Sequence, residues 1–523
     1  MKKIFALLLI LCMLLPMVVA CTDDPPVESS SSQESSSQAP SESTPDESES
    51  ESGNSGNPNP VEPKDKFSSK DTVLDNWTGK TLNVLVTRYG ETAGAPWGQM
   101  ELNPASFGET INAAFNERQA VILEKYGVTV RWIDAMGAQT IYGDLSTAMT
   151  SKDTTYEVAM PRAHEVQSLV QNGVVLDMAQ SDYLTFTKND YFSNAAYEAF
   201  TVANRTLFAA GDYDFSDEQT AYTIFFNKEL AAEYGIEDLY SAVKDGSWTY
   251  DTLRNLSRAV SGDDGNGVQG DEDTYGFATK NVARFYTFAG VFEAYVDPDL
   301  GEYVVTLNKD PAKVKKIVAN MIEVVKGTTW ARQGQDDKGV NGWGGSWGSH
   351  ALDAFNEKRV LFFEEVAQNI DHMGSITFEL GILPFPKLDE EQDRYYVPTT
   401  TVQTTFICAP QCTSDKDFSF YFIDVLSWTG SEYVMEAYYD KLAASVGGEE
   451  DMDIFHEYVF KNIVYDVGAI TNSWNGLLTD VRGKSYANGT DNFTELFEQA
   501  QEQANLTVGS WNDAWNGYFE IIQ

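Results

Sequence analysis

Basic side chains are scarce in this chain of 523 residues. It carries 36 lysines and arginines against 79 aspartates and glutamates, a formal net charge of −43. Nucleic-acid binding requires clustered basic side chains that neutralise phosphates, and attraction to anionic lipid headgroups requires them too. The charge therefore excludes a nucleic-acid partner and argues against a protein whose own surface lies on anionic lipid.

Cysteine and histidine are also rare, with four of each. Cys12 and Cys21 lie near the N-terminus, which leaves Cys408 and Cys412 in the body of the chain. These two form either a local disulfide, which an oxidising compartment permits, or a pair of small apolar residues at the end of a strand. A zinc site is not expected, because no cluster of histidines or further cysteines is nearby.

The apolar run at the N-terminus is too short to remain in a membrane. Lys2 and Lys3 precede apolar residues 4–19, fewer than the roughly 20 that a spanning helix needs. This layout predicts a signal peptide over residues 1–20. The cleavage site resembles a bacterial lipobox, and the resemblance implies a diacylglyceryl lipid on Cys21. In an ordinary cleaved signal, the same cysteine would be an unmodified thiol.

The next segment, residues 21–70, has almost no apolar side chains and is rich in Ser, Glu, Asp and Pro. Such a composition cannot bury enough surface to offset the entropy lost on ordering. We therefore expect a disordered stalk that holds the body away from the outer face of the bacterial cytoplasmic membrane.

The body, from residue 71 onward, is longer than a single hydrophobic core usually supports, so two domains are expected. Apolar periodicity predicts alternating strands and helices, which favour a mainly parallel sheet flanked by helices. Thr249 is expected to cap a helix, and the chain after Asp415 is expected to be mostly helical. The first predicted strands are 81–86, 128–133 and 157–160, and the first helices are 109–126 and 141–149.

Ordered motifs over residues 80–480 resemble the extracellular solute-binding proteins of ABC importers, the family that includes maltodextrin-binding proteins. Each motif is weak alone, and their order along the chain carries the resemblance. The motifs include Phe226-Asn227-Lys228, Ser247-Trp248-Thr249, Asp271-Glu272-Asp273-Thr274-Tyr275-Gly276-Phe277, Lys358-Arg359-Val360-Leu361-Phe362-Phe363 and Gly381-Ile382-Leu383-Pro384-Phe385-Pro386.

The resemblance implies an α/β, two-lobed periplasmic-binding-protein-like fold of type II with a helical C-terminal part. Lobe one would hold residues 71–185 and 380–430, and lobe two would hold residues 186–379 and 431–523. It also implies a monomer that needs no cofactor. Such a protein captures a carbohydrate of the oligosaccharide type between its lobes and delivers it to ABC permease subunits. The alternatives are a peptide-binding protein of the same fold and a surface glycoside hydrolase.

The hydrolase alternative would use neighbouring acids, Asp212 with Asp214 or Glu364 with Glu365, as an acid and base pair. Acid pairs are common in so acidic a chain. The sequence contains no H-E-x-x-H and no phosphate loop. We therefore expect a binding protein rather than an enzyme.

Ligand-binding residues are expected beyond the carboxyl ends of the strands, where loops converge. Two tryptophans in a glycine-rich loop could stack on a sugar ring or, alternatively, brace their loop on lobe two. The candidates are Tyr89, Arg162, His164, Asp212, Tyr213, Trp343, Trp347, Glu364 and Trp474.

A loop rich in Gly and Asp, residues 263–273, gathers oxygen donors of the kind that calcium prefers. The candidate ligands are Asp264, Asn266, Asp271 and Asp273. The loop lacks the spacing of an EF-hand, and the same acids could instead cap the turn between a helix and a strand. Both interpretations remain open from the sequence.

Overall fold

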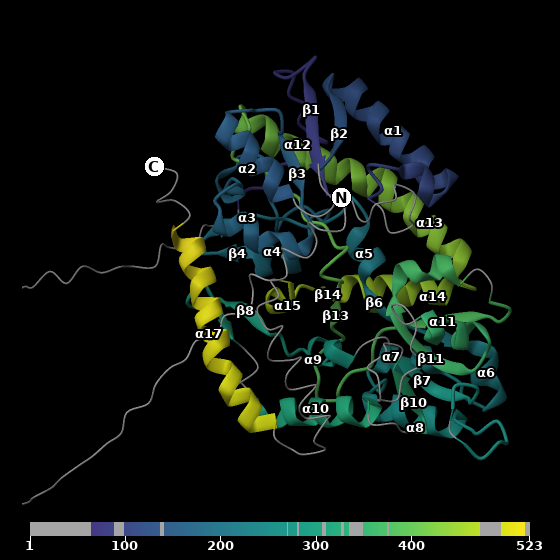
Figure 1. The fold of residues 1–523 in the computed structure, drawn as a ribbon. Coiled ribbons are helices and arrows are strands. Elements are labelled where there is room, and N and C mark those ends of the chain that lie inside the picture. The colour runs from purple at the N-terminus through teal and green to yellow at the C-terminus, as the bar shows by residue number, and fades with distance from the viewer. Residues whose placement is uncertain are drawn as a thin grey trace, which may run out of the picture. The chain divides into compact units, whose positions relative to one another are not determined.

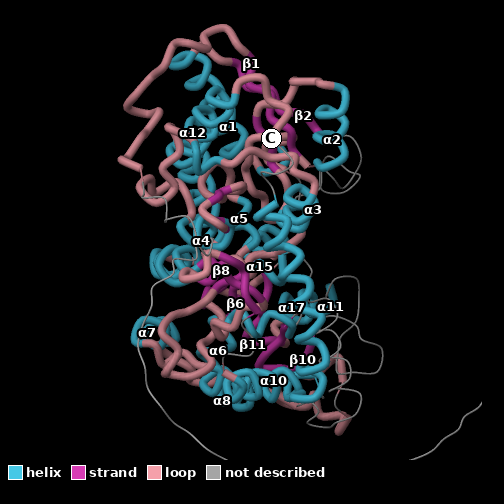
Figure 2. The backbone as a smooth tube through the Cα atoms, turned by 90° about the vertical axis from the view of Figure 1, so that its left-hand side faces the viewer, coloured by secondary structure: helices cyan, strands magenta, loops and turns pink. Residues whose placement is uncertain are grey.

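The computed structural model describes most of the chain after residue 63. The described ranges are 64–87, 99–135, 141–268, 270–279, 282–305, 310–325, 329–333, 349–373, 376–470 and 493–517. The chain divides into two compact units, Met1–Ser55 and Gly56–Gln523, and every described residue lies in the second. Within it, the two largest sheets have three and five strands (Figure 2). We call the regions around these sheets lobe one and lobe two.

Lobe one is built on a three-stranded parallel sheet in the order β2-β1-β3. Alternate residues of β1 point to opposite faces. Leu82 and Val84 therefore pack with α12 in one hydrophobic cluster, and Leu85 packs with α1 and α2 in another. The elements are β1 (Thr81–Val86), α1 (Glu109–Tyr126), β2 (Thr129–Asp134), α2 (Ile141–Ser151), β3 (Val158–Met160), α3 (Val166–Gln171) and α12 (Lys416–Thr429).

Lobe two is built on a five-stranded mixed sheet in the order β10-β7-β11-β6-β12. We expected mainly parallel sheets, and β6 is the exception, because it is antiparallel to β11 and β12. It enters the sheet directly from lobe one, so Tyr222 at its start pairs with Val366 at the end of β11. The strands are β6 (Tyr222–Asn227), β7 (Tyr275–Thr279), β10 (Ala331–Gln333), β11 (Val360–Val366) and β12 (Leu380–Leu383).

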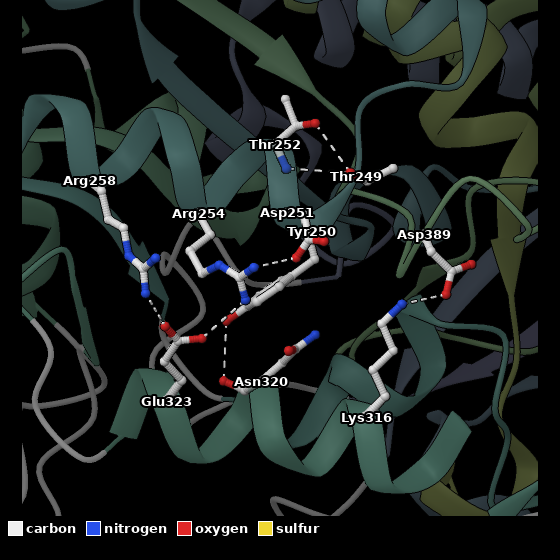
Figure 3. A network of polar contacts seen from close by, with 10 residues as sticks. All are labelled: Thr249, Tyr250, Asp251, Thr252, Arg254, Arg258, Lys316, Asn320, Glu323 and Asp389. Atoms are coloured by element: carbon white, nitrogen blue, oxygen red, sulfur yellow. Dashed lines mark hydrogen bonds and ion pairs between the residues drawn. The ribbon is translucent and has the colours of Figure 1, made fainter. Parts of the chain in front are cut away.

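Helices α8 (Tyr250–Val260) and α10 (Pro311–Val325) lie side by side in lobe two (Figure 3). Helix α8 packs directly on β7, because Gly276 places no Cβ between the strand and the backbone of the helix. The predicted cap of α8 is confirmed, since Thr249 Oγ1 accepts a hydrogen bond from the backbone N–H of Thr252 at 3.4 Å. The hydroxyl of Tyr250 donates to the carbonyl of Asn320 at 3.2 Å and joins the two helices.

Two short stretches of chain cross between the lobes. The first crossing runs through α5 (Ser216–Thr220) into β6. The second crossing runs back from β13 (Val397–Pro398) to residues 405–410. There the backbone bridges to lobe one at Ala159 and Ala209. Side-chain hydroxyls of the two crossings also hydrogen-bond to each other, so the crossings form a shared base between the lobes.

A third crossing is helical. Helix α12 of lobe one continues through the π-helix η7 (Gly430–Met435) into α13 (Glu436–Ser445), as the green ribbon of Figure 1 shows. Gly430 lies against the backbone carbonyl of Asp212, and a Cβ at this position would collide with it. Glycine therefore allows the third crossing to pack closely on the chain that leads into the first.

The C-terminal part is helical, as expected. Helix α17 (Phe493–Gly517) packs its tryptophans Trp511 and Trp515 against Tyr303, with ring centroids 6.0 Å apart in both pairs. The remaining elements are α4 (Asn194–Phe200), β4 (Thr201–Val202), β5 (Arg205–Thr206), α6 (Lys228–Glu233), α7 (Leu239–Asp245), α9 (Phe285–Phe288), β8 (Ala294–Asp297), β9 (Glu302–Val305), α11 (Ser349–Asn356), α14 (Glu449–Ile454), β14 (Ile463–Val464) and α15 (Val467–Ile470).

The structure moves two boundaries of the predicted lobes. We assigned residues 380–430 to lobe one, but β12 pairs with β6 in the lobe-two sheet, so the return to lobe one comes only after β13. We also placed the chain from residue 186 onward in lobe two. Phe186 and Phe192 instead pack in the same hydrophobic cluster as β1, which belongs to lobe one.

Candidate functional site

A cavity lies beside the first and second crossings. It contains about 310 Å³ of empty space, part of it open to solvent. Its lining comes from a loop of lobe one, from both crossings and from the segment that follows β11 in lobe two. The lining residues are Gln99, Met100, Asp214, Phe215, Ser216, Gln219, Thr220, Gln368 and Gln403. Amides and hydroxyls predominate, and such groups both donate and accept hydrogen bonds.

Hydroxyl groups tie the two crossings together beneath this cavity. The hydroxyls of Ser216 and Thr405 lie 2.7 Å apart, and those of Thr220 and Thr404 lie 2.6 Å apart. The hydroxyl of Thr404 also bonds locally to a backbone carbonyl at 2.6 Å. These contacts satisfy buried polar groups at the point where the chain passes between lobes. The base of the cavity is therefore held in a fixed arrangement.

Two amides from different parts of the chain meet at the cavity. Gln368 Nε2, which follows β11, donates to Gln403 Oε1 of the second crossing at 2.9 Å. This bond fixes the orientation of both side chains and leaves the second N–H of Gln368 and the NH₂ of Gln403 available to a ligand. Each amide can thus serve one hydroxyl group of a bound molecule.

Carboxylates surround the first crossing. Asp214 is 4% exposed, and its two oxygens accept bonds from the Thr405 hydroxyl at 2.5 Å and from the backbone N–H of Ser216 at 2.9 Å. Asp217 is 6% exposed, and its Oδ2 accepts a bond from the Tyr465 hydroxyl at 2.6 Å. Both acids are thus positioned by short contacts within the fold.

Burial shifts the acid–base behaviour of this region. It raises the pKa of Glu101 to about 8, with a further rise from the charge of Asp214, while the Arg118 guanidinium opposes the rise. Burial likewise raises the pKa of Asp214, and it raises the pKa of Asp217 well above its ordinary value. Conversely, burial lowers the pKa of Arg118 to about 10. Glu101 therefore holds its proton in much of the protein at neutral pH.

Two further acids lie beside this group, one of them a predicted ligand residue. Asp212 is half-buried, and desolvation raises its pKa to about 6, with a smaller rise from Asp190. Glu218 is also half-buried, and its pKa lies well above its ordinary value because of desolvation and then the charge of Asp217. We call Glu101, Asp212, Asp214, Asp217 and Glu218 the acid group.

The other predicted ligand residues lie in varied places. Arg162 is 3% exposed, and its backbone N–H donates to Glu165 Oε2, whereas His164 is exposed. Tyr213 belongs to the hydrophobic core and donates to the carbonyl of Thr405 at 2.8 Å. Glu364 is fully buried within β11 and accepts a bond from Thr279 at 2.6 Å. Tyr89, Trp343, Trp347, Trp474 and the lipidation residue Cys21 lie outside the described residues.

The two cysteines of the body do not form the local disulfide that we considered. Cys408 and Cys412 are both buried and free. The backbone of Cys408 pairs with Ala159 through two bonds of 2.9 Å, and its thiol packs in the hydrophobic core. Burial raises the pKa of the Cys412 thiol to about 11. The alternative of two small apolar residues at a strand end describes them correctly.

The loop predicted to hold calcium brings only part of the predicted set together. Asp264 and Asp273 have carboxylate oxygens within 4.8 Å of each other and of Asp263, which we had not proposed. Asp271 pairs instead with Arg332. Asp273 also accepts the backbone N–H of Asp264 at 3.0 Å, and Asn266 accepts that of Val268 at 2.6 Å, as turn-capping acids and amides do. Calcium binding at this loop remains a prediction.

Several residues of the cavity lining and of the acid group were not predicted from the sequence. Glu101 and Arg118 are far from Asp214 in sequence and had no local signal, since α1 presents Arg118 as one polar residue among many. The run of threonines around Gln403, residues 399–405, is a local signal in the sequence that could have identified the second crossing.

The chain matches a known protein family. The model of a family described as bacterial extracellular solute-binding protein matches residues 111–443. No curated protein sequence matches the chain. Within the described ranges, no helix has the combination of length and apolar character that a membrane span requires.

Three solved structures share the fold at 13% sequence identity. A sugar transporter protein from Rhizobium etli in an open conformation covers 81% of this chain and 98% of its own, with a TM-score of 0.52. UspC of M. tuberculosis covers 82% and 99%, with a TM-score of 0.52. An ABC substrate-binding protein from Listeria monocytogenes, solved in complex with cycloalternan, covers 82% and 99%, with a TM-score of 0.50.

The two sheets, the three crossings and the cavity beside them define a two-lobed binding protein of the type II periplasmic class. The family model covers more than half of the chain. The protein belongs to the bacterial extracellular solute-binding protein family.

Proposed function

We propose that this protein captures a carbohydrate in the cavity beside the crossings and delivers it to an ABC permease. The observation that carries the proposal is the lining of amides and hydroxyls, supplied by both lobes and by the crossings. Sugar hydroxyls both donate and accept, so Gln368 and Gln403 match them in a way that an apolar lining would not. The Listeria protein with bound cycloalternan and the Rhizobium sugar transporter protein support the same substrate class.

The mechanism follows from the residues on each side of the cavity. A ligand that bonds to Gln99 of lobe one and Gln368 of lobe two makes both contacts only when the lobes are close together. Its binding free energy therefore favours the closed population. The crossings, tied by Ser216 and Thr405, provide the connection about which the lobes would move. The permease would recognise the closed form.

The proposal includes the location and state of the protein. A lipid on Cys21 anchors it to the outer face of the cytoplasmic membrane, and residues 21–70 act as the tether. It works as a monomer and binds without catalysis or a required cofactor. The buried position of Glu364 and Asp214 supports binding over hydrolysis, because their carboxyl groups are hydrogen-bonded within the fold.

A thermal-shift screen against sugars and peptides tests the substrate class. A carbohydrate at 100 times its Kd should raise the free energy of unfolding by about 2.7 kcal/mol. Gln368→Ala should weaken binding of that sugar at least tenfold, or about 1.4 kcal/mol. The matched control is Gln180→Ala, which changes an exposed glutamine away from the cavity. If peptides alone stabilise the protein, the carbohydrate proposal is wrong.

A further inference from the structure

The cavity is lined by Asp214, one of a group of acids that have no ion-pair partner among the described residues. Within the described ranges, no ion pair involves any member of the acid group, Glu101, Asp212, Asp214, Asp217 and Glu218. Arg118 opposes the raised pKa of Glu101 and Asp214 without forming an ion pair with either. Among the residues that the structure describes, no cation contributes to the pKa of Asp212 or Asp217. The site therefore has an excess of potential negative charge.

Glu101 is the most unusual member of the acid group. It is 3% exposed, and neither of its carboxylate oxygens has a hydrogen-bond partner in the described part of the chain. Asp217 Oδ1 is also buried and has no hydrogen-bond partner among the described residues. A buried polar atom left unbonded costs about 1 to 3 kcal/mol. Glu101 directly follows Gln99 and Met100 of the cavity lining, and its interaction with Asp214 shows that it faces the acid group.

Arg118 is already engaged elsewhere. Its Nη2 donates to the carbonyl of Leu426 at 2.9 Å, and its Nε donates to the hydroxyl of Thr429 at 3.4 Å. The guanidinium is thus held on α12, and its position is fixed by bonds to that helix rather than to a carboxylate. One cation in this position cannot balance several acids.

A metal ion does not suit the acid group. Among the described residues, the set Asp263, Asp264 and Asp273 is the one in which three carboxylates converge within 4.8 Å, and it lies in the loop between α8 and β7. Calcium needs six to eight oxygens at about 2.3 to 2.6 Å. Of the acid group, Asp214 is the member that lines the cavity. A single carboxylate in a wall of amides and hydroxyls suits an organic cation whose charge is carried on a larger molecule.

We propose that the carbohydrate bound in this cavity is an amino sugar, whose protonated amine lies beside Asp214 and within the field of Glu101 and Asp217. This inference rests on the proposed carbohydrate function and specifies its substrate class. The amides Gln368 and Gln403 would bond to sugar hydroxyls while the acids select the amine. A cation near buried carboxylates gains more than it would in water, because the local dielectric is low.

Binding of an amine should also change the number of protons that the acids hold. Glu101, with its pKa raised to about 8, holds a proton before binding at neutral pH, and a nearby ammonium favours its ionised form. Binding should therefore release protons to the solvent, by linkage between ionisation and binding. A neutral sugar would release none. Two basic residues lie on segments that pack nearby. Lys441 forms an ion pair with Asp371, and the backbone of Arg162 forms a β-bridge with that of Thr405.

A matched series of ligands tests the inference on the whole soluble chain. Trimers of glucosamine, of N-acetylglucosamine and of glucose, all with the same linkage, differ only in the group at carbon 2. Isothermal titration calorimetry should show the glucosamine trimer binding at least tenfold more tightly than the other two. Its affinity should fall with added salt. Titrations in buffers of different ionisation enthalpy should show about one proton released per amine bound at the site.

Two variants and one control assign the effect to the cavity. Asp214→Asn and Glu101→Gln should each bring the ratio of glucosamine to glucose affinity toward one. Asp251→Asn removes the same charge from an exposed position on α8 and should leave that ratio unchanged. Thermal melts confirm folding of each variant, and the proton release of the unmodified protein needs no variant.

The possible results distinguish the carbohydrate function from the amino-sugar inference. If no carbohydrate of any kind binds, the carbohydrate function is overturned. If the glucose and glucosamine trimers bind equally without proton release, the carbohydrate function stands and the amino-sugar inference is overturned. If spermidine binds as tightly as the glucosamine trimer, the preference is for any cation, and the inference is also overturned.

Discussion

The charges between α8 and α10 are paired, whereas the acid group beside the cavity forms no ion pair in the part of the chain that the structure describes. In the first region, Glu323 lies 2.7 Å from the guanidinium of Arg258 and 3.4 Å from that of Arg254 (Figure 3). Lys316 pairs with Asp389 at 2.6 Å nearby. All of these side chains are at least 24% exposed, so water shares in solvating them.

The two regions differ in what their charges contribute to the stability of the folded state. Exposed ion pairs contribute little, with a median near 0 to 1 kcal/mol, and their loss is easily tolerated. Buried acids without cations lower the stability of the folded state. A fold that retains Glu101 and Asp217 in such surroundings gives up stability at that place, as binding sites commonly do. The comparison predicts opposite responses of the two regions to mutation and pH.

The largest effect should come from Arg118→Met. This variant removes a cation that opposes the raised pKa of Glu101 and Asp214, together with its bonds to α12. We expect a loss of about 3 to 5 kcal/mol in the free energy of unfolding at pH 8. The loss should be smaller at pH 6, where Glu101 keeps its proton. Urea unfolding at the two pH values measures it.

Arg254→Met is the matched control for Arg118→Met. It removes an arginine whose side chain is 25% exposed and paired with Asp251 and Glu323. We expect a loss of no more than about 1 kcal/mol that hardly changes with pH. Equal losses for the two variants would show that the acids beside the cavity do not depend on Arg118.

The next effect is the pH dependence of stability. The pKa of Glu101 is about 8 in the folded protein against an ordinary value of 4.5, so the folded state holds a proton that the unfolded state has lost. Stability should therefore fall as the pH rises from about 4.5 to about 8. One such group contributes up to about 1.4 kcal/mol per pH unit in that window. Asp212 and Asp466, both with a pKa of about 6, add to the fall below pH 6.

Glu101→Gln isolates the share of one acid. Glutamine cannot ionise, so the variant should lose stability less steeply between pH 6 and pH 8 than the unmodified protein. Denaturant unfolding at pH 5.5, 7.0 and 8.5 gives the two slopes. Parallel curves would mean that Glu101 does not carry the raised pKa in solution.

Local patterns predicted much of lobe one and less of the site. Helix α1 begins and ends at the predicted residues, because its apolar spacing is regular and Gly127 takes the left-handed conformation that ends it. Strand β1 also has its predicted bounds. The direction of β6 was not predictable, because a buried strand shows the same apolar run whichever way it pairs.

The acid group shows the limit of local patterns most clearly. Asp214 is visible in the sequence as one of a pair of acids with Asp212, but its neighbours Glu101 and Arg118 come from distant parts of the chain. Only the folding of lobe one onto the crossings brings them together. Burial, which sets their pKa values, is a property of that packing and leaves no mark on the residues themselves.

The smallest effect should come from the paired region. Glu323→Gln breaks the ion pairs with Arg254 and Arg258 but keeps a hydrogen-bond acceptor on α10. We expect a loss of about 0.5 to 1 kcal/mol. A double-mutant cycle with Arg258→Met should give a coupling energy of similar size, and 0.5 M salt should reduce it because exposed pairs are screened. A coupling that exceeded the effect of Arg118→Met would reverse the comparison, because stability would then rest on the exposed charges.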